Sequence, residues 1–85
     1  MPRYFFHVYD GKVTLDPDGM ELRDTAQARR MAVRMAGQIF DDDAELVAHG
    51  EDWHMEVVDE TGLLLFRLDF VVTDAPALPT GTGRR

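Results

Sequence analysis

The residues of this chain best suited to chemistry are its three histidines and its sixteen acidic side chains. His7, His49 and His54 could join nearby carboxylates in a zinc or nickel site, because imidazole nitrogen and carboxylate oxygen suit those ions. Their spacing matches no compact ligand motif. We therefore expect neither a metal site nor a bound cofactor.

Two acidic segments have only a passing likeness to cation sites. The run from Asp16 to Glu21 starts like a calcium loop, but Met20 and Leu22 fall where oxygen ligands are needed, and Gln27 replaces the terminal glutamate. We interpret this run as a turn. In the cluster 41–43, successive aspartates on a helix point in different directions and cannot chelate one ion together.

No sequence motif for catalysis is present. The chain has no cysteine, no serine, no Gly-rich phosphate loop and no His-Glu-x-x-His pair. Tyr9 and His7 could do acid–base work, but nothing in the sequence indicates the cleft that such work needs. We expect a protein that is not an enzyme.

The formal net charge of −7 opposes binding to nucleic acid, because contacts to phosphate need clustered Lys and Arg. Arg29, Arg30 and Arg34 form the only basic patch, which we interpret as a solvated helix face. Recognition of an acidic or phosphorylated partner is the alternative. The first residues lack the long apolar run of a signal peptide or membrane span, so we expect a cytoplasmic protein with no membrane partner.

One long amphipathic stretch, from Asp24 to His49, predicts the only helix. Asp24 and Gln27 have the spacing of a capping box, and Gly50 is typical of the residue after a helix end. Fraying after Phe40, within the acidic cluster, is the alternative end. The apolar face of this helix comprises Ala28, Met31, Ala32, Met35, Ala36, Ile39 and Leu46.

Four alternating segments predict strands in two hairpins that bracket the helix. The segments are 3–9 and 12–16, joined at Asp10-Gly11, and 53–59 and 63–70, joined at Glu60-Thr61-Gly62. The order ββαββ predicts an α+β two-layer sandwich, in which one long helix covers one face of a four-stranded sheet. We expect the first and last strands, which are strongly apolar, to occupy the middle of the sheet. The domain spans 1–73, and 74–85 is a flexible Pro/Gly-rich tail.

Two surfaces are left without a partner by this arrangement. A helix of about 24 residues is about 36 Å long, whereas a seven-residue strand is about 23 Å long, so Leu46 and Val47 would overhang the sheet. The sheet face opposite the helix would display Phe5, His7, Tyr9, Leu65 and Arg67. This face has three interpretations: a solvated face with scattered apolar side chains, the contact of a homodimer, or a platform for a small ligand.

Two motifs connect the chain to a known family. The opening Met-Pro-Arg-Tyr-Phe-Phe-His-Val is followed by Asp10-Gly11 and by the pattern Asp18-Gly19-x-Glu21-Leu22-x-Asp24. A later motif is Val57-Val58-Asp59-Glu60-Thr61-Gly62. In these segments the chain resembles a family of small uncharacterised bacterial proteins, a domain of unknown function, from Met1 to Phe70. The resemblance implies a stand-alone, bacterial, cytoplasmic domain, and it implies no catalytic or binding residues.

Our leading hypothesis is a small non-enzymatic interaction or regulatory domain that forms a homodimer, with a further protein partner possible. The absence of catalytic motifs, the overhanging helix and the second sheet face motivate it. The alternative is a module that senses a small ligand or a metal through the same face and its histidines.

Overall fold

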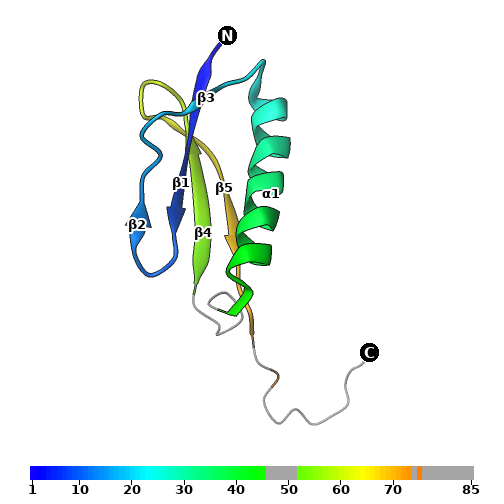
Figure 1. Ribbon diagram of the computed structural model, residues 1–85. Coiled ribbons are helices and arrows are strands. Elements are labelled where there is room, and N and C mark those ends of the chain that lie inside the picture. Colours follow the sequence, from blue (N-terminus) through cyan, green and yellow to red (C-terminus); the bar gives the residue numbers. More distant parts are fainter. Residues whose placement is uncertain (46–51, 74, 76–85) are drawn as a thin grey trace.

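The computed structural model describes residues 1–45, 52–73 and 75, and within them it has one antiparallel sheet and one long helix on one of its faces (Figure 1). The α+β class is confirmed. The elements are β1 (Arg3–Tyr9), β2 (Val13–Thr14), β3 (Met20–Glu21), α1 (Thr25–Asp42), β4 (Trp53–Val58) and β5 (Leu64–Phe70). The sheet therefore has five strands instead of four, and their order along the chain is βββαββ.

The extra strand arises because the predicted second strand is divided in two. β2 pairs with the end of β1 through Tyr9 and Val13, and β3 pairs with its start through Arg3 and Glu21. Between them the chain turns away at Asp16, and Pro17 has no backbone N–H to donate to β1. Both short strands thus lie on the same side of β1.

The order of the long strands corrects one expectation. Across the sheet the order is β2–β1–β4–β5, so β1 and β4 are central and β5 is at the edge. The expectation that the last strand lies in the middle is wrong for the described part of the chain. The turn at 59–62 places β5 directly beside β4, and β1 takes the other side of β4.

The side chain of Asp16 closes the gap between β2 and β3. Its Oδ2 accepts a hydrogen bond from the Phe6 backbone N–H at 3.2 Å, and its Oδ1 accepts from Asp18 and Gly19 at 3.1 and 3.0 Å. In return the Asp16 backbone N–H donates to Nδ1 of His7 at 3.0 Å. Asp16 and His7 thus replace the ladder bonds that a continuous strand would supply.

Gly19 allows the turn after Asp16 to lie tightly against β1. Its φ is +71°, and a Cβ atom there would lie 2.8 Å from Cε2 of Phe5 and 2.9 Å from the carbonyl oxygen of Tyr4. A larger side chain therefore cannot fit without moving the backbone of β1.

The predicted start of the helix is confirmed and its predicted end is corrected. Oδ1 of Asp24 accepts from the Gln27 backbone N–H at 2.8 Å, and Gln27 Oε1 accepts from the Arg23 backbone N–H at 2.7 Å. α1 ends at Asp42, inside the acidic cluster, where carboxylates oppose the negative end of the helix dipole. The backbone of 44–45 is again helical, and the remainder of the predicted helix, 46–49, lies outside the described residues.

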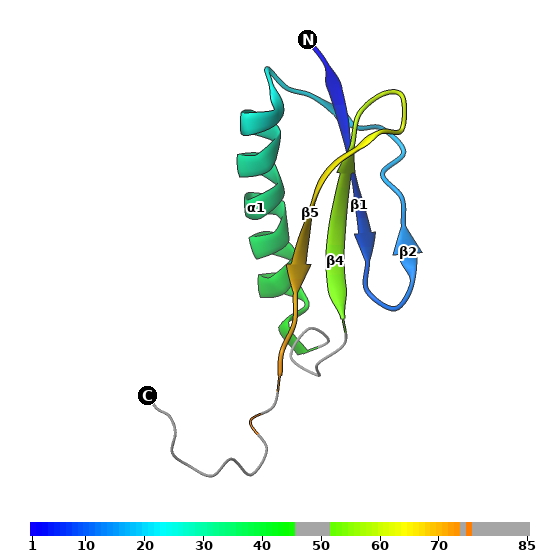
Figure 2. The same cartoon turned by 180° about the vertical axis from the view of Figure 1, so that it is seen from behind.

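A stripe of alanines sets how α1 packs. Ala28, Ala32 and Ala36 are buried, and their small side chains let the helix approach β4 and β5 closely, as Figure 2 shows from behind. The buried core consists of these alanines with Tyr4, Phe6, Leu22, Trp53, Met55 and Val57.

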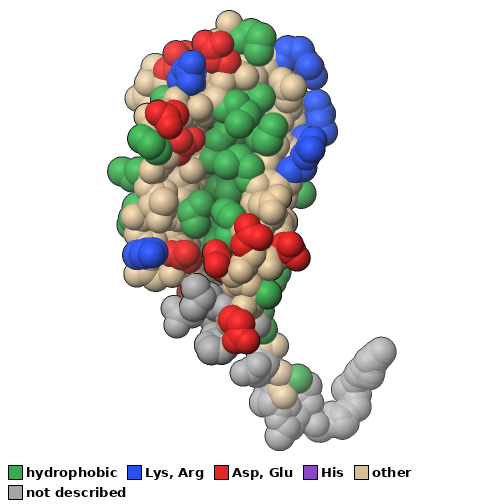
Figure 3. All heavy atoms as spheres, in the orientation of Figure 1, with side chains coloured by type: hydrophobic (Ala, Val, Ile, Leu, Met, Phe, Trp, Pro, Cys, Tyr) green, Lys and Arg blue, Asp and Glu red, His purple; other side chains and the backbone are tan. Residues whose placement is uncertain are grey.

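The helix side of β1 is covered as well, since Tyr4 and Phe6 are each only 4% exposed. Figure 3 shows hydrophobic side chains in a band beside the Arg side chains of the helix. A shallow groove of about 330 Å³ runs there, lined by Met31, Arg34, Met35, Gln38 and Ile39.

We expect Asp16→Ala to lower the free energy of unfolding by about 2 kcal/mol, because three backbone N–H groups lose a charged acceptor. Urea denaturation measures this. Asp18→Ala is the control, since it removes a neighbouring carboxylate that makes no hydrogen bond among the described residues. Equal losses in the two variants would contradict the role assigned to Asp16.

The contribution of Asp16 should also depend on pH. Partial burial raises the pKa of Asp16, but the backbone N–H groups of Gly19, Phe6 and Asp18 together outweigh that effect, so the pKa lies below its usual value. Its stabilising effect is therefore complete above the unfolded-state pKa of about 3.9 and is lost as the pH falls through the folded-state pKa. The difference in unfolding free energy between wild type and Asp16→Asn should be constant near neutral pH and shrink below about pH 4. A difference unchanged across that range would show that the charge contributes nothing.

Candidate functional site

The sheet face that α1 leaves uncovered carries a patterned set of polar side chains across β1, β4 and β5. The antiparallel register places them in three rows, which are Tyr9–His54–Asp69, His7–Glu56–Arg67 and the apolar pair Phe5–Val58. Each row crosses the sheet at right angles to the strands. The face is thus polar at one end and apolar at the other.

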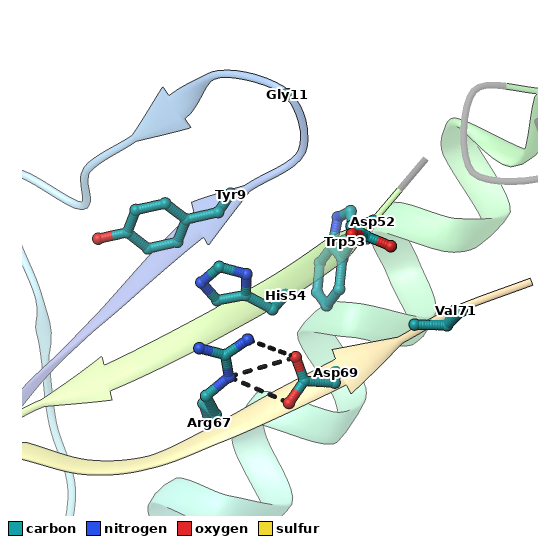
Figure 4. Close-up of a pocket in the computed structure, with 8 residues that line it drawn as sticks. All are labelled: Tyr9, Gly11, Asp52, Trp53, His54, Arg67, Asp69 and Val71. Atoms are coloured by element: carbon teal, nitrogen blue, oxygen red, sulfur yellow. Dashed lines mark hydrogen bonds and ion pairs between the residues drawn. The ribbon is translucent and has the colours of Figure 1, made fainter. Parts of the chain in front are cut away.

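A hollow of about 410 Å³ lies at the polar end of this face (Figure 4). The ring of His54 stacks on the ring of Tyr9, with centroids 4.5 Å apart and planes 7° from parallel. The hollow is lined by Tyr9, Gly11, Asp52, Trp53, His54, Arg67, Asp69 and Val71. This arrangement offers an aromatic surface beside an ion pair.

The ion pair joins Arg67 and Asp69 along β5. Nη2 of Arg67 donates to Oδ1 of Asp69 at 2.6 Å, and Nε donates to Oδ2 at 3.0 Å. This hydrogen bonding lowers the pKa of Asp69 and raises the pKa of Arg67, so both groups are charged at neutral pH. β5 consequently carries one positive and one negative charge, side by side.

Glu56, the middle residue of the row His7–Glu56–Arg67, connects the two polar rows. Its Oε2 is 3.3 Å from Nε2 of His54 and 3.9 Å from Nη1 of Arg67. Desolvation, followed by the negative charge of Glu56, raises the pKa of Tyr9. Among the described residues, no group of three or more His, Cys, Asp or Glu side chains is placed to hold a metal ion.

The structure separates the residues predicted for the interface. Phe5, His7, Tyr9 and Arg67 lie on the uncovered face, although His7 already accepts the Asp16 backbone N–H. Leu46 and Val47, like His49 of the considered metal site, lie outside the described residues.

Leu65 is a correction to that set. The register shifts at a bulge, so that Val57 pairs with Phe66 but Val58 pairs with Leu64. Leu65 is the extra residue, and it is partly buried against the core cluster. Leu64 takes a place opposite Val58 and is 48% exposed. Sequence alternation alone cannot reveal such a shift, because one inserted residue exchanges the faces of all residues before it.

Residues 3–71 match the family described as Domain of unknown function (DUF6894). The chain belongs to this family. No curated protein and no solved structure is matched by the chain. The family name assigns no activity to the DUF6894 domain, and within the described residues no helix is long and apolar enough to cross a membrane.

Sequence reasoning missed one exposed feature of this DUF6894 domain, which is the outer edge of the sheet along β5. β5 pairs with β4 on one side and has no strand on its other side in the described part of the chain. Exposed aliphatic side chains stand at both ends of β5, with Leu64 at its start and Val71 and Val72 just after its end. The apolar residues on either side of Arg67 and Asp69 were the sequence feature that could have indicated this exposed apolar edge.

The helix borders the same edge. A groove of about 290 Å³ between α1 and β5 is lined by Val33, Ala36, Gly37, Phe40, Trp53, Leu68, Asp69 and Phe70. Val33 is 56% exposed, and a Cβ atom on Gly37 would meet nothing within 4 Å. The apolar groove and the outer edge of β5 therefore lie next to each other.

We expect Glu56→Gln to lower the pKa of Tyr9 toward its usual value of about 10, because the nearby negative charge is lost. Ultraviolet absorbance titration in a Tyr4→Phe background follows Tyr9 alone, since the chain has two tyrosines. Glu60→Gln, in the exposed turn before β5, should leave the titration unchanged. An identical titration in Glu56→Gln would contradict the described geometry.

Proposed function

We propose that this DUF6894 domain is a non-enzymatic interaction domain that forms a homodimer along the β5 side of its sheet. The uncovered face, with Phe5, His7, Tyr9 and Arg67, then extends across both copies and can receive a further protein partner. A bacterial, cytoplasmic setting, as the family resemblance implies, belongs to the same proposal.

The observation that supports the proposal is the contrast between the two edges of the sheet. The outer side of β1 is covered by β2, by β3 and by the Asp16 side chain between them. The outer side of β5 offers seven residues of strand with exposed aliphatic side chains at its ends. An uncovered apolar edge strand is a template for pairing with another chain, and proteins that stay monomeric usually protect it.

The charge distribution also supports dimerisation along β5. A net charge of −7 repels a second copy over most of the surface, so self-association needs a region of low local charge. β5 supplies one, because Arg67 and Asp69 cancel each other and its other residues are apolar.

A second candidate function is the binding of a small polar ligand in the hollow beside Tyr9 and His54. The stacked rings and the adjacent Arg67–Asp69 pair favour it, since pockets for small ligands combine aromatic surface with a few polar groups. Equilibrium dialysis against metabolites and divalent metals tests this function, and it would be rejected if none bound near micromolar concentration.

The proposed dimer is tested by a matched pair of valines. Val71 and Val13 are both 58% exposed, but Val71 follows β5 whereas Val13 lies on β2 at the opposite edge. Because a buried charge disfavours association, Val71→Asp should weaken the dimer at least tenfold (about 1.4 kcal/mol), while Val13→Asp leaves it unchanged. Native mass spectrometry and light scattering over a concentration series measure this.

Circular dichroism checks that both variants keep their fold. A wild-type protein that stays monomeric at every concentration would overturn the proposed function. Dissociation by Val13→Asp instead of Val71→Asp would move the contact to the other edge.

A further inference from the structure

We infer that two copies of this chain pair their β5 strands antiparallel about a two-fold axis at Leu68, forming one continuous sheet. This inference rests on the proposed homodimer and specifies its register. In that register Arg67 of one copy lies opposite Asp69 of the other, and the same pair recurs on the far side of the axis.

Among axes at residues 67, 68 and 69, the charges of β5 favour the one at Leu68. For the two helices to lie on the same face of a continuous sheet, a residue must pair with itself at the axis. An axis at Arg67 would place two arginines directly opposite each other, and an axis at Asp69 would do the same with two aspartates. Like charges in directly opposed positions are destabilising, whereas the axis at Leu68 opposes unlike charges twice.

The apolar residues of β5 fit the same register. On the helix side, Phe66 of one copy lies opposite Phe70 of the other, and aromatic cross-strand pairs stabilise sheets. Beyond them, Leu64 of one copy comes beside the 71–72 segment of its partner, so the exposed aliphatic side chains at the two ends cover each other. Exposed ion pairs add little affinity, so the charges set the register and the apolar contacts provide the attraction.

The position of α1 is compatible with a second helix beside it. α1 contacts both β4 and β5. Neighbouring strands are about 4.8 Å apart, so the axis lies about 2.4 Å outside β5, and a helix placed midway over these two strands would lie about 5 Å from it. The two α1 helices are then about 10 Å apart, a usual distance for packed helices. Val33 and Gly37, which line the groove beside Leu68, face their counterparts across this space.

The register also explains why the last strand has the composition of a central strand. Within one copy β5 is at the edge, yet apolar side chains occupy most of its positions. In the paired sheet β5 has a neighbour on both sides, as its sequence predicts.

Single cysteines test the register, because the chain has no cysteine of its own. Directly opposed residues in antiparallel strands have Cα atoms about 4.5–5.5 Å apart, within reach of a disulfide, whereas diagonal neighbours lie about 7–8 Å apart and cannot be bridged. Leu68→Cys should therefore form a covalent dimer under mild oxidation, and Arg67→Cys should not. Non-reducing electrophoresis gives the cross-linked fraction.

Leu68→Cys shortens a side chain that is partly buried against the core, and this could itself disturb the fold. An exchange of the charges at 67 and 69 tests the same register and leaves Leu68 in place. Arg67→Asp should weaken the dimer at least about tenfold, because it opposes two carboxylates across the axis. Arg67→Asp combined with Asp69→Arg should restore wild-type dimerisation, since unlike charges again face each other.

Cross-linking by Arg67→Cys in place of Leu68→Cys would overturn the inferred register, as would a failure of the double exchange to restore the dimer. If neither cysteine cross-links although the wild type is a dimer, the β5 pairing is wrong while self-association stands. If the wild type is monomeric throughout, the proposed function fails together with the inference.

Discussion

The Asp16 carboxylate accepts hydrogen bonds from three backbone N–H groups and thereby closes the outer edge of β1. Two strands of two residues each could not cover that edge alone, because they leave the outer side of Phe5, Phe6 and His7 without a strand partner. Gly19 lets the turn approach β1 closely enough for these hydrogen bonds. Nδ1 of His7 accepts a further hydrogen bond from the Asp16 backbone N–H. With this edge closed, β1 is confined to the interior of the sheet, and β5 is left as the place where the sheet can grow.

The free edge of β5 then connects the packing of the monomer with its proposed role. The alanine stripe of α1 brings the helix over β4 and β5, so an apolar groove that includes Val33 follows the outer edge of β5. Backbone hydrogen bonds, apolar side chains and a neutral pair of charges are all available along one edge. In strand addition, backbone hydrogen bonds give affinity and side-chain contacts give specificity.

Much of the fold could be predicted from local sequence signals, and the errors have physical causes. The cap at Asp24, the alanine face of α1 and the bounds of β1 follow from capping chemistry and periodicity. The division of the second strand depends on the Asp16 side chain bonding to a residue ten positions away, which no local pattern encodes. Composition suggested a central place for β5, but position in a sheet is set by pairing, including pairing with a second chain. The bulge at Leu65 likewise changed which residues reach the uncovered face.

Amide hydrogen exchange along β5, measured at low and high protein concentration, tests the central claim most directly. The backbone N–H groups of β5 that point away from β4 exchange rapidly in a monomer and become protected when a second strand pairs with them. The account predicts that protection of these amides rises with protein concentration, while the Phe6 amide, already bonded to Asp16, is protected throughout. Rapid exchange of the outward β5 amides at every concentration would contradict it.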